Sequence, residues 1–438
     1  MQVTELRNRF RELGDEWRST REESGESSLL PDPPQSERKY LVVSVDDHLI
    51  EPPDIFEGRL SAKFQARAPK VVEDGHGGQM WLFEGRMHAG IGLAASAGRK
   101  LEQCAFDPDR YEFMRPGAFD PKARLYDMDL DGVYASASFP SSLVGFGGQR
   151  LQLQVEPEFA IELVGAVNDW HLNDWCGTSP DRLIPIQIPY LHDAAVAAEQ
   201  IERNAARGFH AVSFPEAPHK LGLPSIHSGY WEPFFAACEA TETVLCLHVG
   251  SSSDCPTPAP DSPLDTVAAL FSTYAMFTAV DWLYSKIPVR YPGIRIAMSE
   301  GGIGWVPGFI DRLNHVARYQ RLYGTWKGVE LTTAELYHRN FWNCTIEDPA
   351  TMRLRDVIGV DRIMVESDYP HPDTSWPETQ DRLTSHFDGF TPDEIAAVTW
   401  RNASELFQLP IPESVIADVN SYASPYGDYA ADVLLANA

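Results

Sequence analysis

Residues 182–214 read RLIPIQIPYLHDAAVAAEQIERNAARGFHAVSF and contain the pattern that decides the fold. Two short apolar runs, RLIPIQI (182–188) and FHAVSF (209–214), flank a helix candidate over 192–207. A nearly continuous apolar run is typical of a strand that is covered on both faces, as in a parallel sheet. The stretch therefore predicts a strand, a helix and a second strand in succession.

The same alternation extends over most of the chain. Six further runs have the composition of buried strands: LVVSV (41–45), GVYASASF (132–139), TVLCLHV (243–249), IRIAMS (294–299), FWNCTI (341–346) and RIMVES (362–367). Helix candidates lie between most of them, over 155–175, 229–241, 264–290 and 303–323. Eight strands alternating with helices predict an α/β fold, a distorted (β/α)8 TIM barrel. The main alternative is a doubly wound open sheet, although the GxGxxG motif that often marks such a sheet is absent.

Three segments fall outside this alternation. Residues 57–119 follow the first strand and are rich in glycine, which predicts a β-rich, hairpin-containing insertion that acts as a lid on the barrel over 39–409. Residues 1–38 are predicted to form an N-terminal arm, an amphipathic helix and a linker, that docks on the barrel or on a second subunit. Residues 410–438 are predicted to form an irregular C-terminal arm.

Composition limits the partners and the location. The 438 residues include 36 Lys and Arg against 63 Asp and Glu, and the formal charge of −27 disfavours nucleic acid and anionic membranes as partners. No run reaches the ~18 apolar residues of a transmembrane helix, and the charged N-terminus lacks the apolar region of a signal peptide. The six cysteines are scattered without CxxC spacing. We therefore expect a cytoplasmic protein with reduced thiols.

Polar residues stand where several of the predicted strands end. Asp46 and His48 lie two apart on the first strand and so share a face, which gives half of a divalent-metal site. A histidine that is simply paired with a neighbouring carboxylate is the alternative. His248 ends the fifth strand, Glu300 follows the sixth and Asp368 follows the eighth. Because the catalytic residues of such a barrel gather at the carboxyl ends of the strands, these polar ends predict one shared site.

At these motifs the chain resembles the amidohydrolase superfamily. The resemblance is to the amidohydrolase-related branch that includes aminocarboxymuconate-semialdehyde decarboxylases, aromatic-acid decarboxylases and meta-cleavage-product hydrolases. It covers roughly residues 40–408. The matching residues are Asp46-Asp47-His48 with Glu51-Pro52, His248, Glu300-Gly301-Gly302-Ile303-Gly304-Trp305, Ser367-Asp368-Tyr369-Pro370-His371 and Arg401-Asn402-Ala403.

The resemblance implies one divalent metal ion per chain, held by Asp46, His48, His248 and Asp368. The first motif of the wider superfamily is often His-x-His, whereas this chain has Asp46 at its first position. Zn²⁺ is the first expectation and Mn²⁺ the second, because an oxygen-rich set suits both. The predicted fourth strand offers no lysine for carbamylation, so we expect a mononuclear site.

Two reactions fit this site. The first prediction is hydrolysis of a C–N, C–O or activated C–C bond next to a carbonyl by a metal-activated water, with Asp368 as general base. Glu300 or His371 would then pass the proton to the leaving group. The alternative is non-oxidative decarboxylation of an aromatic or unsaturated acid, with Asp368 as the acid. Many decarboxylases of this branch have a histidine where this chain has Glu300, which favours hydrolysis.

The remaining predictions concern binding. Trp305, Trp376 and His219 are candidates for contact with a small-molecule substrate, although packing is the more common use of the two tryptophans. Barrels of this branch commonly associate, so we expect a homo-oligomer, a dimer or higher. A barrel that has lost its metal and serves as a binding protein is the hypothesis from another class.

Overall fold

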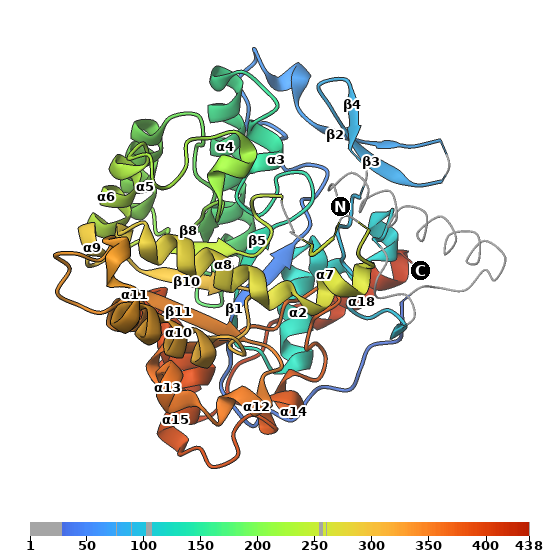
Figure 1. Cartoon of the computed structure of the whole chain (residues 1–438). Coiled ribbons are helices and arrows are strands. Elements are labelled where there is room, and N and C mark those ends of the chain that lie inside the picture. The colour runs from blue at the N-terminus through green and yellow to red at the C-terminus, as the bar shows by residue number, and fades with distance from the viewer. Residues whose placement is uncertain are drawn as a thin grey trace.

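A computed structural model describes residues 29–75, 77–88, 90–101, 107–253, 257–259 and 261–437 (Figure 1). The helix predicted near the N-terminus lies outside these residues. The strands of the central sheet are β1 (Val43–Leu49), β5 (Ala135–Pro140), β6 (Leu183–Ile184), β7 (Ile186–Gln187), β8 (Ala211–Ser213), β9 (Val244–His248), β10 (Ile296–Ser299), β11 (Phe341–Thr345) and β12 (Ile363–Val365).

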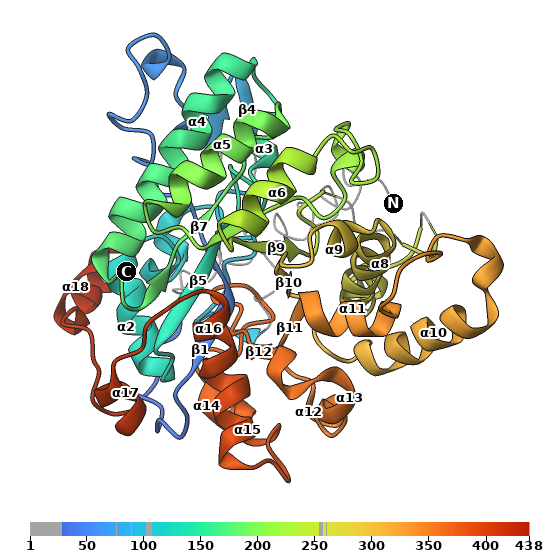
Figure 2. The same ribbon diagram turned by 90° about the vertical axis from the view of Figure 1, so that its left-hand side faces the viewer.

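The helices that follow these strands in the chain cover the outside of the sheet (Figures 1 and 2). They are α2 (Pro121–Asp131), α3 (Gln149–Gln152), α4 (Pro157–Trp170), α5 (Ala194–Ala205), α6 (Glu232–Ala240), α7 (Leu264–Ala269), α8 (Phe271–Tyr284), α9 (Ile287–Arg290), α10 (Val306–Tyr319), α11 (Thr333–Asn340), α12 (Pro349–Met352), α13 (Arg355–Ile358), α14 (Thr379–Thr384), α15 (Pro392–Ala396) and α16 (Asn402–Leu406). Short 3-10 turns and two π-helical turns, His171–Trp175 and Ala397–Arg401, join them.

The sheet closes into a barrel through one interrupted strand. The strand order is β6-β5-β1-β12-β11-β10-β9-β8-β7, and the pairs are parallel. β6 and β7 are successive pieces of a single strand on either side of Pro185, and β6 pairs with β5 while β7 pairs with β8. The two ends of the order therefore meet, which confirms the predicted eight-stranded barrel and excludes the open sheet.

The strands are apolar because both of their faces are covered. Leu245 and Leu247 of β9 belong to the core between the barrel and its helices, together with Phe234 and Phe235 of α6. The alternate residues of β9, Val244 and Cys246, belong to a second cluster that faces the barrel axis. Burial on both faces explains the continuous apolar runs of the sequence.

The insertion after β1 contains an antiparallel sheet of its own, β2 (Lys70–Glu73), β3 (Gln79–Phe83) and β4 (Arg86–His88), which stands apart from the barrel in Figure 1. Trp81 of β3 is buried, so this sheet is anchored by an apolar face. No described helix has the length and apolar content needed to cross a membrane.

The C-terminal segment differs from the irregular arm that we predicted. It contains α17 (Glu413–Ala417) and α18 (Gly427–Asn437). Val415 and Tyr422 are buried, and the Arg38 guanidinium lies 3.9 Å from the centre of the Tyr422 ring. The segment is therefore ordered by packing against the barrel, a long-range effect that its own composition does not show. The boundaries of the arm and of the lid remain predictions.

Candidate metal centre

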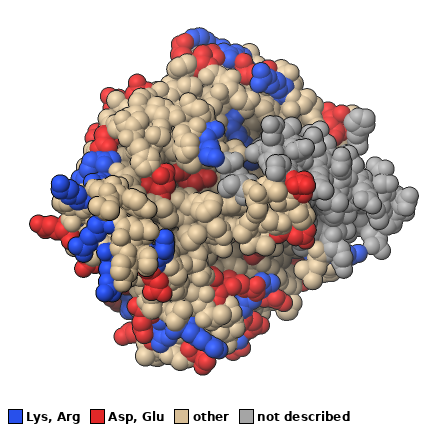
Figure 3. Space-filling model, viewed as in Figure 1, with Lys and Arg blue, Asp and Glu red and all other residues tan. Residues whose placement is uncertain are grey.

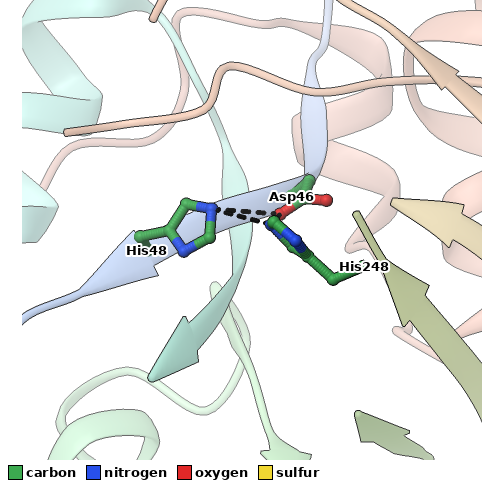
Figure 4. Close-up of side chains that lie close together, drawn as sticks. All are labelled: Asp46, His48 and His248. Atoms are coloured by element: carbon green, nitrogen blue, oxygen red, sulfur yellow. Dashed lines mark hydrogen bonds and ion pairs between the residues drawn. The ribbon is translucent and has the colours of Figure 1, made fainter. Parts of the chain in front are cut away.

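The predicted site residues lie at the carboxyl ends of four barrel strands. Asp46 and His48 belong to β1, and His248 is the last residue of β9 (Figure 4). Glu300 and Asp368 follow β10 and β12. Strand pairing sets His248 beside Ser299, directly before Glu300. The structure therefore brings together residues that are distant in the sequence.

Two backbone features direct these side chains. The register between β1 and β5 shifts between Ser44 and Asp47, an irregularity of the kind that re-aims side chains next to functional sites. Glu300 and Asp368 have positive φ angles of 54° and 51°. Left-handed backbone at a residue with a Cβ is strained and is retained where the surroundings enforce it, often at functional sites.

The ligand atoms converge within a few ångströms. The Nε2 atoms of His48 and His248 are 3.1 Å apart, and Asp46 Oδ1 is 3.6 Å from each of them. Asp368 Oδ1 is 3.3 Å from His48 Nε2. Each of these four side chains is at most 1% exposed. Carboxylate oxygens and imidazole nitrogens at such spacing can share one divalent cation.

The protonation states of the two histidines and the lack of partners for the two carboxylates also suit the binding of a cation. Both carboxylate oxygens of Asp46 and of Asp368 have no hydrogen-bond partner among the described residues, and an unpaired buried carboxylate is costly. Burial, together with neighbouring acids, raises the pKa of both groups. Burial lowers the pKa of His48 and brings the pKa of His248 to about 3, so both imidazoles are neutral and have a lone pair for a metal. A divalent ion would balance the carboxylate charge and accept these lone pairs.

Outer contacts orient the ligands. His248 Nδ1 lies 2.7 Å from the carbonyl oxygen of Val249 and can donate to it, which leaves Nε2 free for a metal. Asp47 turns to the other side of β1, where it accepts from Ser367 Oγ at 2.5 Å and from the Tyr369 backbone N–H at 3.1 Å. Asp47 thus connects β1 to the turn that contains Asp368.

Glu300 is the carboxylate of the cluster that reaches the solvent side. Its Oε2 lies 3.2 Å from His248 Nε2, and its side chain is 11% exposed whereas that of Asp368 is 0% exposed. The backbone N–H of Glu300 donates to Glu366 Oε2 at 3.1 Å, and the thiol of Cys344 donates to the same oxygen. Glu366 is buried, and its burial raises its pKa to about 8.

Glu366, Cys344 and Phe146 lie at the site although no sequence pattern pointed to a role for them. Glu366 precedes Asp368 by two positions at the end of the eighth strand, and this spacing was the available signal. The Phe146 ring lies 4.2 Å from the His248 ring and 4.8 Å from the His48 ring, so it forms an aromatic wall beside the cluster. Phe146 lies in a loop after β5, so no strand periodicity or motif spacing in the sequence predicts its place at the site.

His371 lies within the cluster. Its ring stacks on that of His48 at 3.7 Å between centres, and its Nδ1 is 3.2 Å from Asp368 Oδ1. Burial lowers the pKa of His371 to about 4. The two groups are close enough to form an ion pair when the imidazole is protonated. A catalytic role for Asp368, Glu300 and His371 remains a prediction.

The three candidate substrate contacts lie in different settings. Trp305 donates from Nε1 to the Gly301 carbonyl oxygen at 3.0 Å and packs against Phe309. Trp376 is buried and donates to the Asp127 carbonyl oxygen at 3.0 Å. Both tryptophans thus have packing contacts. His219 is exposed in the 3-10 turn Pro218–Leu221. Their contact with substrate stays a prediction.

Comparisons with known proteins concern the family and the fold. The family model described as Amidohydrolase matches residues 102–409. No curated protein matches the chain. The fold is similar to that of an amidohydrolase from Mycobacterium avium subsp. paratuberculosis K-10, with 23% identity and a TM-score of 0.66 over 84% of this chain and 99% of that chain.

Two further solved structures share the fold. The 5-carboxyvanillate decarboxylase of Novosphingobium aromaticivorans DSM 12444, complexed with manganese and 4-hydroxy-3-methoxy-5-nitrobenzoic acid, is 20% identical, with a TM-score of 0.58 over 87% of this chain and 100% of that chain. A dihydroxybenzoic acid decarboxylase from Polaromonas sp. JS666, with manganese and 2-nitroresorcinol, is 18% identical, with a TM-score of 0.57 over 86% of this chain and 99% of that chain.

Proposed function

The chain belongs to the amidohydrolase family, and from that premise we propose that it is a metal-dependent decarboxylase of a hydroxylated aromatic acid. The observation that carries the proposal is the position of Asp368 Oδ1, which is 3.3 Å from His48 Nε2 and 3.2 Å from His371 Nδ1. Decarboxylation needs one proton for each CO₂ released, and this contact provides a carboxyl group at the metal site with an imidazole to reload it. The aromatic acids named with the two decarboxylase structures support the substrate class.

Asp46, His48, His248 and Asp368 would hold the metal. The ion would supply positive charge that binds the substrate carboxylate and an adjacent hydroxyl and draws electrons from the ring. Mn²⁺ is the first ion to test because both similar decarboxylases were crystallised with manganese, and Zn²⁺ is the second.

The chain's own residues would place the ring and move the proton. The Phe146 ring offers a face on which an aromatic substrate can stack. The bond between the ring carbon and the carboxyl carbon breaks, its electron pair takes the proton of Asp368, and CO₂ leaves. His371 then passes a proton from solvent back to Asp368.

Hydrolysis is the second candidate, and Glu300 is the observation that favours it. A partly exposed carboxylate 3.2 Å from His248 Nε2 is placed to take a proton from an attacking water. The substrate would then have a C–N, C–O or activated C–C bond next to a carbonyl. In the sequence, the residue type at position 300 is the feature that favours hydrolysis.

One experiment separates the two reactions. Protein stripped with a chelator and reloaded with Mn²⁺ or Zn²⁺ is incubated in D₂O with hydroxybenzoic acids, methoxylated hydroxybenzoic acids, aryl esters and lactones. The proposal expects CO₂ and a product with one deuterium on the vacated ring carbon. His371→Gln should slow CO₂ release while it retains metal, and the matched control His227→Gln should not. Ring opening or ester cleavage by metal-loaded protein, without CO₂ from any acid, would assign the chain to hydrolysis instead.

A further inference from the structure

A network of polar contacts runs from the segment before β1 to the turn that contains Asp368. We call it the Arg115 network; its members are Asp32, Arg115, Asp127 and Tyr369. Arg115 Nη2 lies 2.9 Å from Asp32 Oδ1 and 2.5 Å from Asp127 Oδ1. Tyr369 follows Asp368 in the chain and donates its hydroxyl to the other carboxylate oxygen of Asp127. The network therefore ends at the residue next to a proposed metal ligand.

The centre of the network is buried. Figure 3 shows charged side chains of both signs spread over the surface, where solvent surrounds them. By contrast, the side chains of Arg115 and Asp127 are 1% and 2% exposed, and Tyr369 is 3% exposed. A buried ion pair contributes little to stability, because the loss of hydration offsets the attraction between the charges. What the pair fixes is the place of its partner, since a Tyr369 hydroxyl that moved away would lose a charge-assisted hydrogen bond.

Two glycines make room for these side chains. A Cβ atom at Gly117 would collide with Asp127 Oδ2 and would lie 2.8 Å from Tyr369 Oη. A Cβ atom at Gly98 would lie 2.6 Å from Arg115 Cδ. Real Cβ atoms do not come this close to other heavy atoms. The backbone at the two glycines therefore packs directly on the network, and the Tyr369 ring has little freedom to shift.

The turn itself needs such support. Asp368 has a φ angle of 51°, and a strained backbone of this kind persists only where its surroundings hold it. The hydroxyl of Tyr369 is held by the network on one side of the turn. On the other side, the backbone N–H groups of Ser96 and Ala97 donate to the Pro370 carbonyl oxygen at 2.8 and 2.9 Å. The place of the Asp368 carboxylate thus depends on contacts that the turn makes with other segments.

Asp32 connects the network to the described part of the predicted N-terminal arm, residues 29–38. Its side chain is 30% exposed, and its Oδ2 accepts from Tyr126 Oη at 3.1 Å. Two positions earlier, the Leu30 N–H donates to the Gly98 carbonyl oxygen at 2.7 Å. The arm is therefore fastened to the insertion at one of the two glycines that pack on the network.

We infer that the Arg115 network positions Asp368 for the metal ion and that Asp32 of the arm completes the network. Arg115, Asp127 and Tyr369 are positioning residues, since each acts on the Asp368 carboxylate through the backbone of the turn. The inference rests on the proposed metal site and holds for either reaction there. It makes the affinity of the site for a divalent ion depend on contacts of the arm.

Metal affinity of the full chain tests the inference without a substrate. Chelator-stripped protein is titrated with Mn²⁺, and electron paramagnetic resonance of the free ion gives the dissociation constant. Tyr369→Phe deletes one hydroxyl and should raise the Kd about 10-fold. The matched control is Tyr422→Phe, which removes a buried hydroxyl that donates to the Gly132 carbonyl oxygen at 3.2 Å and should leave the Kd unchanged. If Tyr369→Phe lowers only the stability of the metal-free protein and not the Mn²⁺ affinity, the inference is overturned.

An added methyl group tests the same contact if Tyr369→Phe fails to fold. Gly117→Ala places a Cβ atom against Asp127 and Tyr369 and should also raise the Kd. The control is Gly165→Ala on α4, where a Cβ atom would meet no neighbour within 4 Å. Equal Mn²⁺ affinities for Gly117→Ala and Gly165→Ala would contradict the positioning of Asp368.

Asp32→Asn tests the contribution of the arm. This variant weakens the ion pair at the exposed end of the network and should raise the Kd about 2- to 5-fold. Lys39→Met removes an arm ion pair of similar exposure, with Asp381 at 2.7 Å, and should leave the Kd as it was. An unchanged Kd in Asp32→Asn overturns the role of the arm. A wild-type chain that binds neither Mn²⁺ nor Zn²⁺ overturns the proposed metal site as well, whereas unchanged affinities in the variants overturn this inference alone.

Discussion

The Nε2 atoms of His48 and His248 lie 3.1 Å apart, although 200 positions separate the two residues in the chain. Both imidazoles are neutral because burial lowers their pKa, and His248 uses its other nitrogen toward the Val249 carbonyl oxygen. Barrel closure thus presses ligand atoms and buried carboxylates together. Without a cation, the buried carboxylates lower the stability of the folded state. The size of this effect depends on pH, because it depends on whether the carboxylates are ionised.

Chelation should destabilise the protein more at pH 8 than at pH 5. Without a metal, burial raises the pKa of Asp46, Glu300 and Asp368 above their unfolded values, so the folded state binds more protons. The stability associated with this binding is full below about pH 4 and is lost as the pH rises through the folded pKa values. A bound cation favours the ionised form of these carboxylates, so metal-loaded protein loses less stability over this pH range. Urea unfolding of chelated and reloaded protein at both pH values measures the difference, and an equal effect of chelation would contradict the cation site.

If the reaction is the hydrolysis in which Glu300 takes a proton from water, Glu366→Ala should lower kcat about 10- to 100-fold with little change in KM or metal content. Glu366 accepts the backbone N–H of Glu300 at 3.1 Å and so holds the strained turn that presents the Glu300 carboxylate. Glu366→Gln keeps an acceptor oxygen and should recover most of the activity. Steady-state kinetics with metal analysis checks this. If the two variants behave alike, the hydrogen bond does not position Glu300.

Phe146→Ala should raise KM about 2- to 10-fold and leave the bound metal unchanged. The reason is the loss of the ring that stands beside His248 and His48, because an aromatic pair contributes about 0.5–1.5 kcal/mol. Phe146→Leu keeps the bulk without the ring and should fall between. The control is Phe390→Ala, a half-buried ring that packs on Arg355. An unchanged KM in Phe146→Ala would remove the ring from the binding site.

Asp131→Asn should flatten the pH dependence of stability between about pH 4 and 7. Asp131 is buried and accepts from the Thr379 N–H at 3.0 Å and from Thr379 Oγ1 at 2.5 Å, and burial raises its pKa to about 7. The raised pKa means that stability is highest below the unfolded pKa and is lost as the pH rises through 7, by at most about 1.4 kcal/mol per pH unit. Denaturant titrations of the wild type and the variant at pH 5 and 8 measure this slope. Asp393→Asn, at an exposed position, should leave the slope as it was.

Much of the barrel was predictable because each strand is a recognisable apolar run in the sequence. All eight predicted strands are present, since burial on both faces demands continuous apolar runs. The ends of parallel strands share one edge, so Asp46, His248 and Asp368 could be expected in one place before any coordinates. The same argument brought Glu300 to the site.

The rest depends on contacts between distant residues. Glu366 matters through its contact with Glu300, 66 positions away, and such a contact leaves no local pattern. Phe146 reaches the site through the path of a loop. Trp305 follows a site motif, yet it packs against Phe309 of α10 because a helix begins at the next residue. The C-terminal segment is ordered because Tyr422 packs against the barrel. The sequence of the segment alone does not show this contact.

The break at Pro185 gives the barrel a seam. Each piece of the interrupted strand, β6 and β7, pairs with a single neighbour over two residues, and proline contributes no amide hydrogen to either ladder. Strand pairing along this line is therefore short compared with the four registered pairs between β9 and β10. Local opening of a folded protein begins where its backbone bonding is weak, so amide exchange should be faster along this line than in β9 and β10. The seam lies across the barrel from β10 and β11, and the strands that present Glu300 and hold Cys344 can therefore stay paired while it opens.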